Sequence, residues 1–316
     1  MALWYALMRW FGLIISVLVV VVTLLSCSRA RPRQAVDLPL VRTQTGHLMI
    51  SIGVNDRDGL KFVLDTGATG TVISPATREL LQLRPVADVA AATAATAAGG
   101  KMADAAQYWL ARVRVGGRAH RDVRVWEIPL DKIAAISPDI AGILGRDFLS
   151  QYELEIDFPG QVVRLLSPRE RPLPAKTAQV SFSIGKDDLM HSELVVAGVK
   201  IPAIVDLGAQ ATILNDHAAK AAMLEPVTGA RAATAAGADG TPIALVRRTV
   251  KQIRIGDLDL ADRVVFSGDL PVFTMLGFEG QPAAILGLDL LGNRTIRIDF
   301  AKQMIYLWAS QSAMKP

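Results

Sequence analysis

The sequence predicts a mainly β protein that consists of two related domains in tandem. Short strands separated by Gly, Pro, Asn and Asp turns dominate the chain, and only residues 75–83 and 216–223 show a helical period. An internal repeat also runs through the chain, because an apolar strand that ends in Asp-x-Gly-Ala occurs at residues 62–68 and again at residues 203–209. The length of 316 residues is sufficient for two domains of about 130 residues, each with its own core.

The repeat extends well beyond these two motifs. The two aspartates lie 141 residues apart, and the segments 141–149 and 283–291 repeat an apolar-apolar-Gly sequence at a spacing of 142 residues. Each copy then ends in an alternating hairpin, at residues 154–165 and at residues 296–307. Three matching landmarks in the same order indicate an internal duplication.

Asp65 and Asp206, which end the two repeated strands, are the candidate catalytic residues. A duplication can bring two such carboxylates to one site, where two neighbouring negative charges are unfavourable and the pair shares one proton. The ionised carboxylate can then accept a proton from water while the protonated one donates to a substrate carbonyl. We expect Asp147 and Asp289 to cap or brace the helices after the apolar-Gly segments, not to catalyse.

A proline-rich segment separates the two copies. Three prolines and several charged residues lie within residues 168–177, which we interpret as a linker. The first domain is therefore placed at residues 40–167 and the second at residues 178–309.

The amino terminus has the pattern of an export signal. Residues 1–26 combine an early arginine, a 15-residue apolar run and small residues at its end, which predicts a signal peptide. Cys27 is the single cysteine of the chain, and its position resembles the lipidated cysteine of a bacterial lipoprotein signal. The alternative is an uncleaved anchor helix, although the run is shorter than the roughly 20 residues of a membrane span. In both cases residues 27–39 form a membrane-proximal linker of a protein tethered at the periplasmic face of a bacterial membrane, with the outer membrane favoured.

The first motif and its downstream segment resemble the retropepsin-like aspartic proteases. The resemblance rests on the sequences Phe-Val-Leu-Asp-Thr-Gly-Ala at residues 62–68 and Ile-Leu-Gly-Arg-Asp at residues 143–147. It covers most of residues 40–166 and, more loosely, residues 178–308. It implies two acid-protease β-barrel domains that form a pepsin-like, pseudo-two-fold bilobal unit in one monomeric chain. It further implies an aspartic-type endopeptidase that cleaves peptide or protein substrates with two aspartates and an activated water.

The resemblance also assigns supporting residues around the two aspartates. The loops that carry the aspartates are supported by Thr66, Gly67, Leu207 and Gly208. Hairpin flaps that cover the substrate are expected at Thr96, Gly99, Gly100, Thr234, Gly237 and Gly240, whose segments are rich in small residues.

The second copy departs from the family at two positions. Leu207 replaces the motif threonine Thr66, so at least half of the hydrogen bonding between the two loops is expected to be missing. Leu288 replaces Arg146, so an ion pair of Arg146 has no counterpart in the second copy. Two alternatives to an intramolecular protease therefore stay open. One is a catalytically silent peptide-binding module, and the other is a protease that is active only as a homodimer of the first domain.

Composition argues against other classes of function. The net charge is +4 and the basic residues are scattered, so nucleic-acid binding has little support. The four histidines stand far apart, and no pair has the spacing of metal ligands. No phosphate-binding glycine loop follows a strand into a helix, so neither a metal nor an organic cofactor is expected.

Overall fold

A computed structural model describes most of the chain from residue 35 onward. The described residues are 35–86, 92–95, 101–129, 139–167, 171–229, 231, 233–236 and 242–310. The expected signal peptide at residues 1–26, Cys27, and the flap candidates Thr96, Gly99, Gly100, Gly237 and Gly240 lie outside these residues. Within the described part, none of the helices has the length and apolar character needed to cross a membrane.

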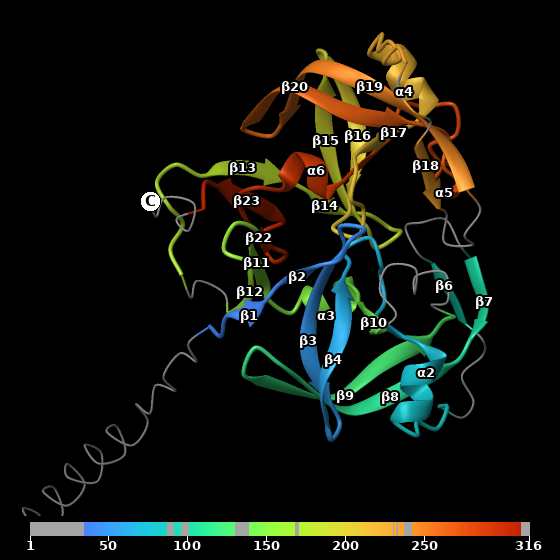
Figure 1. Cartoon of the computed structure of the whole chain (residues 1–316), viewed down its shortest axis with the longest axis vertical. Coiled ribbons are helices and arrows are strands. Elements are labelled where there is room, and N and C mark those ends of the chain that lie inside the picture. The colour runs from blue at the N-terminus through green and yellow to red at the C-terminus, as the bar shows by residue number, and fades with distance from the viewer. Residues whose placement is uncertain are drawn as a thin grey trace, which may run out of the picture. The chain divides into compact units, whose positions relative to one another are not determined.

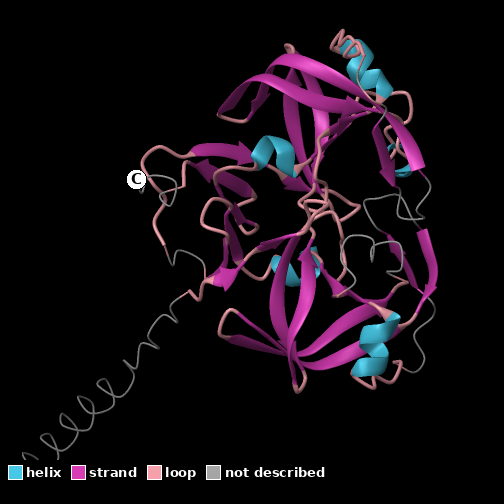
Figure 2. Cartoon of the chain, viewed as in Figure 1, coloured by secondary structure: helices cyan, strands magenta, loops and turns pink. Residues whose placement is uncertain are grey.

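The described residues form a mainly β protein, as the sequence predicts (Figure 2). The helices in this part of the chain are short: α2 (Pro75–Leu80), α3 (Arg146–Leu149), α4 (Asp216–Ala221), α5 (Pro271–Met275) and α6 (Leu288–Leu291). Both helices expected from the sequence are present as α2 and α4. Each begins after a capping side chain, Ser74 or Asn215, that accepts a hydrogen bond from a backbone N–H of the first turn.

Both of these helices end earlier than expected. Gln82 and Met223, two positions beyond the last helical residue of α2 and α4, have φ angles of 51° and 50°. A left-handed residue at this position terminates a helix, and it is usually a glycine. Because no glycine stands at either position, these helix ends could not be predicted from the sequence.

The first lobe is a seven-stranded sheet that closes on itself, in the lower part of Figure 1. Its strands in spatial order are β2 (Val41–Arg42), β3 (Leu48–Val54), β4 (Arg57–Leu64), β10 (Ile140–Leu144), β5 (Val72–Ile73), β9 (Arg118–Glu127) and β8 (Gln107–Val115). Closure comes from the additional pairing of β3 with β8.

The second lobe repeats this arrangement with eight strands. Their spatial order is β14 (Ser183–Ile184), β15 (Met190–Val196), β16 (Val199–Val205), β21 (Ala284–Leu286), β17 (Ile213–Leu214), β20 (Leu258–Ser267), β19 (Pro242–Ile255) and β18 (Ala233–Ala236). Here β15 pairs with β19 and closes the sheet, as β3 and β8 do in the first lobe. The two lobes therefore have the same strand arrangement, as the internal repeat predicts.

A third sheet joins the lobes. Its six strands in spatial order are β1 (Leu38–Pro39), β12 (Val162–Leu166), β11 (Glu153–Asp157), β22 (Thr295–Asp299), β23 (Met304–Trp308) and β13 (Ala178–Ser181). The two hairpins that end the repeats meet in its centre, where β11 of the first lobe pairs with β22 of the second. Strand β1 belongs to this sheet, although it lies within the segment expected to be a membrane-proximal linker.

One continuous apolar core supports this arrangement. It contains Phe62 and Leu144 of the first lobe, Ile156 and Ile298 of the joining sheet, and Leu207 of the second lobe. Two smaller clusters flank it, one in each lobe. The lobes therefore share their interior and do not form two separate cores.

Two hairpins, one from each lobe, lie on the side of the molecule away from the joining sheet (Figure 1). In the first lobe β6 (Ala92–Ala95) pairs with β7 (Lys101–Ala105), and in the second β18 pairs with the first residues of β19. In the sequence, the expected flap residues outside the described part lie between the paired strands of these hairpins. Thr234 is the flap candidate that the structure describes, and it lies exposed in β18 opposite Ala244.

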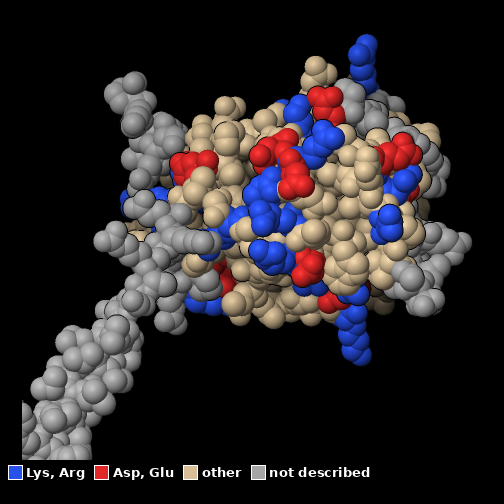
Figure 3. All heavy atoms as spheres, turned by 90° about the horizontal axis from the view of Figure 1, so that it is seen from below, with Lys and Arg blue, Asp and Glu red and all other residues tan. Residues whose placement is uncertain are grey.

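The surface carries charges of both signs. On the face drawn in Figure 3, Lys and Arg side chains lie beside Asp and Glu side chains. This mixture agrees with the small net charge of +4.

Candidate active site

The same strand arrangement places Asp65 and Asp206 in the two lobes. Asp65 follows β4, which runs parallel to β10, and its backbone N–H donates to Leu144 O at 3.1 Å. Asp206 follows β16, which runs parallel to β21, and its backbone N–H donates to Leu286 O at 3.1 Å. The apolar-Gly segments of the repeat therefore pack beside the strands that carry the aspartates.

The loops after these strands bring the two carboxyl groups together. A Cβ atom built on Gly67 would lie 2.6 Å from Cγ of Asp206, and one built on Gly208 would lie 2.6 Å from Cγ of Asp65. Each carboxyl group thus lies directly over the glycine of the opposite loop. Any larger residue at either glycine would force the loops apart, which explains why glycine stands at both positions.

Hydrogen bonds from the backbone orient both carboxyl groups. Oδ1 of Asp65 accepts from the N–H groups of Gly67 at 2.8 Å and Ala68 at 3.1 Å, and Oδ1 of Asp206 accepts from Gly208 at 2.7 Å. The two carboxyl groups also lie close enough for each to change the pKa of the other.

Burial changes the acidity of this pair. Desolvation and then the neighbouring Asp206 carboxylate raise the pKa of Asp65 well above its ordinary value of 3.8. Desolvation also raises the pKa of Asp206, which is 8% exposed. Such a pair titrates as one unit that keeps a single proton over a range of pH above 3.8.

Thr66 links the two loops, and Leu207 does not reciprocate. The Thr66 hydroxyl donates to Val205 O at 3.2 Å and accepts from the N–H of Leu207 at 3.0 Å, across the boundary between the lobes. The Leu207 side chain is fully buried in the shared core. The two hydrogen bonds made by Thr66 are therefore present. Leu207, at the equivalent position of the second loop, makes apolar contacts instead.

Two threonines at equivalent positions of the repeat, which the sequence analysis misses, hold the loops through the aspartates of the following helices. Thr71 donates through N–H and Oγ1 to the carboxylate of Asp147, at 3.0 and 2.7 Å. In the second lobe, Thr212 donates in the same way to Asp289, at 2.9 and 2.7 Å. Both threonines stand six residues after an aspartate of the dyad, so an alignment of the repeat could have found them.

Arg146 makes an ion pair that has no equivalent in the second copy, where Leu288 stands at the same position. It lies in α3 of the first lobe and binds Asp188 of the second, with Nη2 at 3.0 Å from Oδ1 and Nε donating to the backbone oxygen at 2.5 Å. Leu288 is buried in the core instead. Among the described residues, no group of three or more His, Cys, Asp and Glu side chains could hold a metal ion.

Comparisons with known proteins agree with this geometry. A family model described as "Aspartyl protease" matches residues 50–148, and one described as "gag-polyprotein putative aspartyl protease" matches residues 192–293. A stretch of 124 residues is 33% identical to DNA damage-inducible protein 1 of Chaetomium globosum. It covers 39% of this chain and 26% of that protein, so the chain spans about a quarter of its relative.

Two solved structures share the fold of both lobes. The structure of edgp has a TM-score of 0.55 and 9% identity, and covers 90% of this chain and 96% of its own. Basic 7S globulin from soybean has a TM-score of 0.55 and 9% identity, and covers 90% of this chain and 99% of its own. These likenesses concern the fold alone.

The raised pKa of Asp65 predicts that the carboxyl group destabilises the fold at neutral pH. The folded protein keeps a proton that the unfolded chain releases above pH 3.8, so stability falls as the pH rises through this range. Asp65→Asn, which keeps a neutral acceptor for the Gly67 N–H, should therefore raise the melting temperature at pH 7 by several degrees. The gain should disappear below pH 3.8, where the wild-type group is protonated in both states. A lower melting temperature at every pH would contradict this.

The link through Thr66 predicts a second effect on stability. Thr66→Val leaves Val205 O and the N–H of Leu207 without this partner in a buried setting, which should lower the free energy of unfolding by about 1–3 kcal/mol. Thr66→Ser keeps the hydroxyl and serves as the matched control, with a loss of about 1 kcal/mol or less for the methyl group. Urea denaturation measures both, and equal losses would argue against a role for the hydrogen bonds.

Proposed function

We propose, from the premise that both halves of this chain belong to the retropepsin-like aspartic protease family, that the protein is an aspartic endopeptidase with Asp65 and Asp206 as its dyad. The observation that carries the proposal is the position of each carboxyl group over the glycine of the opposite loop. Both aspartates come from one chain, so the proposed enzyme needs no partner subunit.

The proposed reaction uses the single proton of the pair. The ionised carboxylate accepts a proton from a water molecule as that water attacks the carbonyl carbon of the peptide bond. The protonated carboxyl group donates to the carbonyl oxygen, which gives a neutral tetrahedral intermediate. Return of a proton to the amide nitrogen then allows the C–N bond to break. Burial supports this chemistry, because it keeps one member of the pair protonated above the ordinary pKa of aspartate.

The substrate class follows from the family: a peptide or an extended segment of a protein. The hairpins β6–β7 and β18–β19 are the elements that we propose as flaps over this substrate. Thr234, the described flap candidate, lies in β18 opposite Ala244, which is consistent with this proposal.

One observation favours a second candidate, a peptide-binding module without activity. Leu207 removes one of the two hydroxyl groups that link the loops in the family, so the dyad is held from one side only. Thr66 nevertheless reaches both Val205 and Leu207, and each carboxyl group still lies over the glycine of the opposite loop. We therefore place catalysis first.

Cleavage of an unbiased peptide library tests catalysis directly. The full chain should cleave peptides in a manner that pepstatin inhibits, and Asp65→Asn or Asp206→Asn should each reduce the rate at least about 10³-fold, because each removes one half of the acid–base pair. Asp262→Asn is the matched control, since Asp262 makes an exposed ion pair with Lys251 far from the dyad in the chain. Binding of peptides without cleavage would identify the silent module.

A mixture of the two inactive variants tests the homodimer alternative. If both aspartates act within one chain, equal amounts of Asp65→Asn and Asp206→Asn protein stay inactive together. Recovered activity of the mixture would instead show pairing between chains. Activity of the Asp206→Asn protein by itself would show that two first lobes form a site from two Asp65 residues.

Leu207→Thr tests whether the missing hydroxyl limits the enzyme. By the symmetry of the loops, a threonine here would face the backbone of Leu64 and Thr66, as Thr66 faces Val205 and Leu207. We expect kcat to rise severalfold. Leu207→Val, which shortens the side chain without adding a hydroxyl, should not raise it. An unchanged rate for the threonine variant would mean that Leu207 holds the loop as well as threonine does.

A further inference from the structure

The joining sheet brings one pair of equivalent residues face to face. Strands β11 and β22 are antiparallel, and Glu155 of the first lobe is paired with Arg297 of the second. These two residues occupy the same position of the repeat, since they are 142 residues apart, as Gly145 and Gly287 are. Among the residue pairs of β11 and β22, only this pair joins two residues at the same position of the repeat. The pseudo-two-fold axis of the sheet therefore passes through it.

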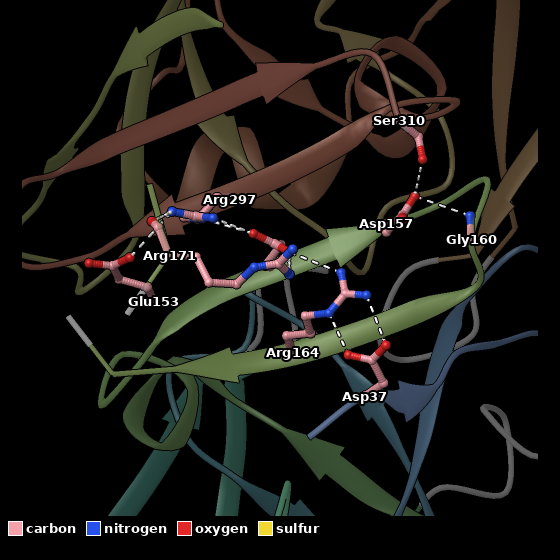
Figure 4. Close-up of polar contacts among 9 residues, drawn as sticks. Asp37, Glu153, Asp157, Gly160, Arg164, Arg171, Arg297 and Ser310 are labelled. Atoms are coloured by element: carbon pink, nitrogen blue, oxygen red, sulfur yellow. Dashed lines mark hydrogen bonds and ion pairs between the residues drawn. The ribbon is translucent and has the colours of Figure 1, made fainter. Parts of the chain in front are cut away.

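The axis pair is a buried ion pair. Arg297 donates to Oε2 of Glu155 from Nε at 3.0 Å and from Nη2 at 2.5 Å. The side chains are 4% and 2% exposed. Figure 4 shows that arginines also approach this site from β12 and from the linker. Arg164 and Arg171 each donate to Oε1 of Glu155, at 3.0 and 2.9 Å.

The surroundings of the pair differ between the lobes. On the first-lobe side, Arg164 is held by two hydrogen bonds to Asp37, at 2.5 and 2.9 Å (Figure 4). On the second-lobe side, the neighbour of Arg297 in the sheet is Tyr306, followed by Gln179. Across the strands, this row of side chains alternates in charge from Asp37 through Arg164 and Glu155 to Arg297, and then continues with uncharged polar residues.

The linker and an aromatic ring hold the cation in place. Arg297 donates from Nη1 to the backbone oxygen of Arg171 at 2.7 Å, and its guanidinium lies 5.3 Å from the centre of the Trp308 ring. The linker residue Arg171 therefore contacts both members of the pair, Glu155 through its side chain and Arg297 through its backbone.

We infer that the Glu155–Arg297 pair makes each lobe select an unlike lobe as its partner, and so prevents the pairing of two identical halves. Two first lobes joined in the same register would place Glu155 against Glu155. Two second lobes would place Arg297 against Arg297. Like charges directly opposite each other destabilise a strand pair, and in a buried position the loss of the opposite charge adds to the cost. In a Glu155–Glu155 axis, Arg164 and Arg171 would still face each glutamate, but Oε2 would lose both hydrogen bonds from Arg297. In an Arg297–Arg297 axis, both cations would lose the carboxylate of Glu155. Discrimination arises because only the unlike pair keeps these hydrogen bonds.

The Glu155–Arg297 pair acts on the association of the lobes and not on the aspartate dyad, so this role is independent of proteolysis. It also explains how a duplicated chain avoids the alternative in which first domains pair with each other. The partner that the first lobe selects is a strand with a cation at the position of Arg297.

Charge variants of the full chain reproduce the two excluded pairings within one molecule. Arg297→Glu gives the Glu–Glu axis of two first lobes, and Glu155→Arg gives the Arg–Arg axis of two second lobes. We expect each to melt several degrees below its neutral counterpart, Arg297→Met or Glu155→Gln. The double variant Glu155→Arg/Arg297→Glu should melt above both charge-reversed single variants. Lys251→Glu, which places like charges at an exposed pair with Asp262, is the control and should change the melting temperature little.

If Glu155→Arg does not fold, the comparison of Arg297→Glu with Arg297→Met still tests the inference. Arg297→Glu should then be more harmful than Arg297→Met in the wild-type chain, and this difference should shrink in the Glu155→Gln background. Equal melting temperatures for Arg297→Glu and Arg297→Met at neutral pH would overturn the inference.

Discussion

The pairing of β11 with β22 determines how the two lobes are placed against each other. It joins the two copies of the repeat in one sheet and fixes the axis that relates them. Since each lobe has the same strand order around its aspartate, a fixed axis is enough to bring the two aspartate loops face to face. The shared apolar core, which runs through both lobes and the joining sheet, gives this arrangement its stability.

At the site itself, stability and chemistry oppose each other. Two carboxyl groups are buried against each other, which raises the pKa of both and makes the folded state less stable at neutral pH than a neutral pair would be. The surroundings compensate through Thr66, through the backbone N–H groups that hold each carboxylate, and through the Thr–Asp braces behind the loops. A pair that shares one proton is what the proposed reaction requires.

The repeat in the sequence predicted two related, mainly β domains and suggested that Asp65 and Asp206 come together, while the bilobal acid-protease fold was implied by the family resemblance. The sequence could not predict how the lobes join. The alternating pattern of residues 154–165 and 296–307 identifies hairpins but does not say which strand lies beside which. The signal was present in the opposite charges at the equivalent positions 155 and 297, which become meaningful only once the register is known. The ends of α2 and α4 were missed for a local reason, since Gln82 and Met223 adopt the left-handed conformation without glycine.

The central claim is that the two halves hold one proton between Asp65 and Asp206. Carbon-13 NMR of the aspartate carboxyl carbons, titrated in the full chain and assigned with the Asn variants, measures this directly. The account predicts two coupled titrations, with one carboxyl group that stays protonated well above pH 3.8. Two independent titrations near 3.8, each unaffected by substitution of the other residue, would contradict it.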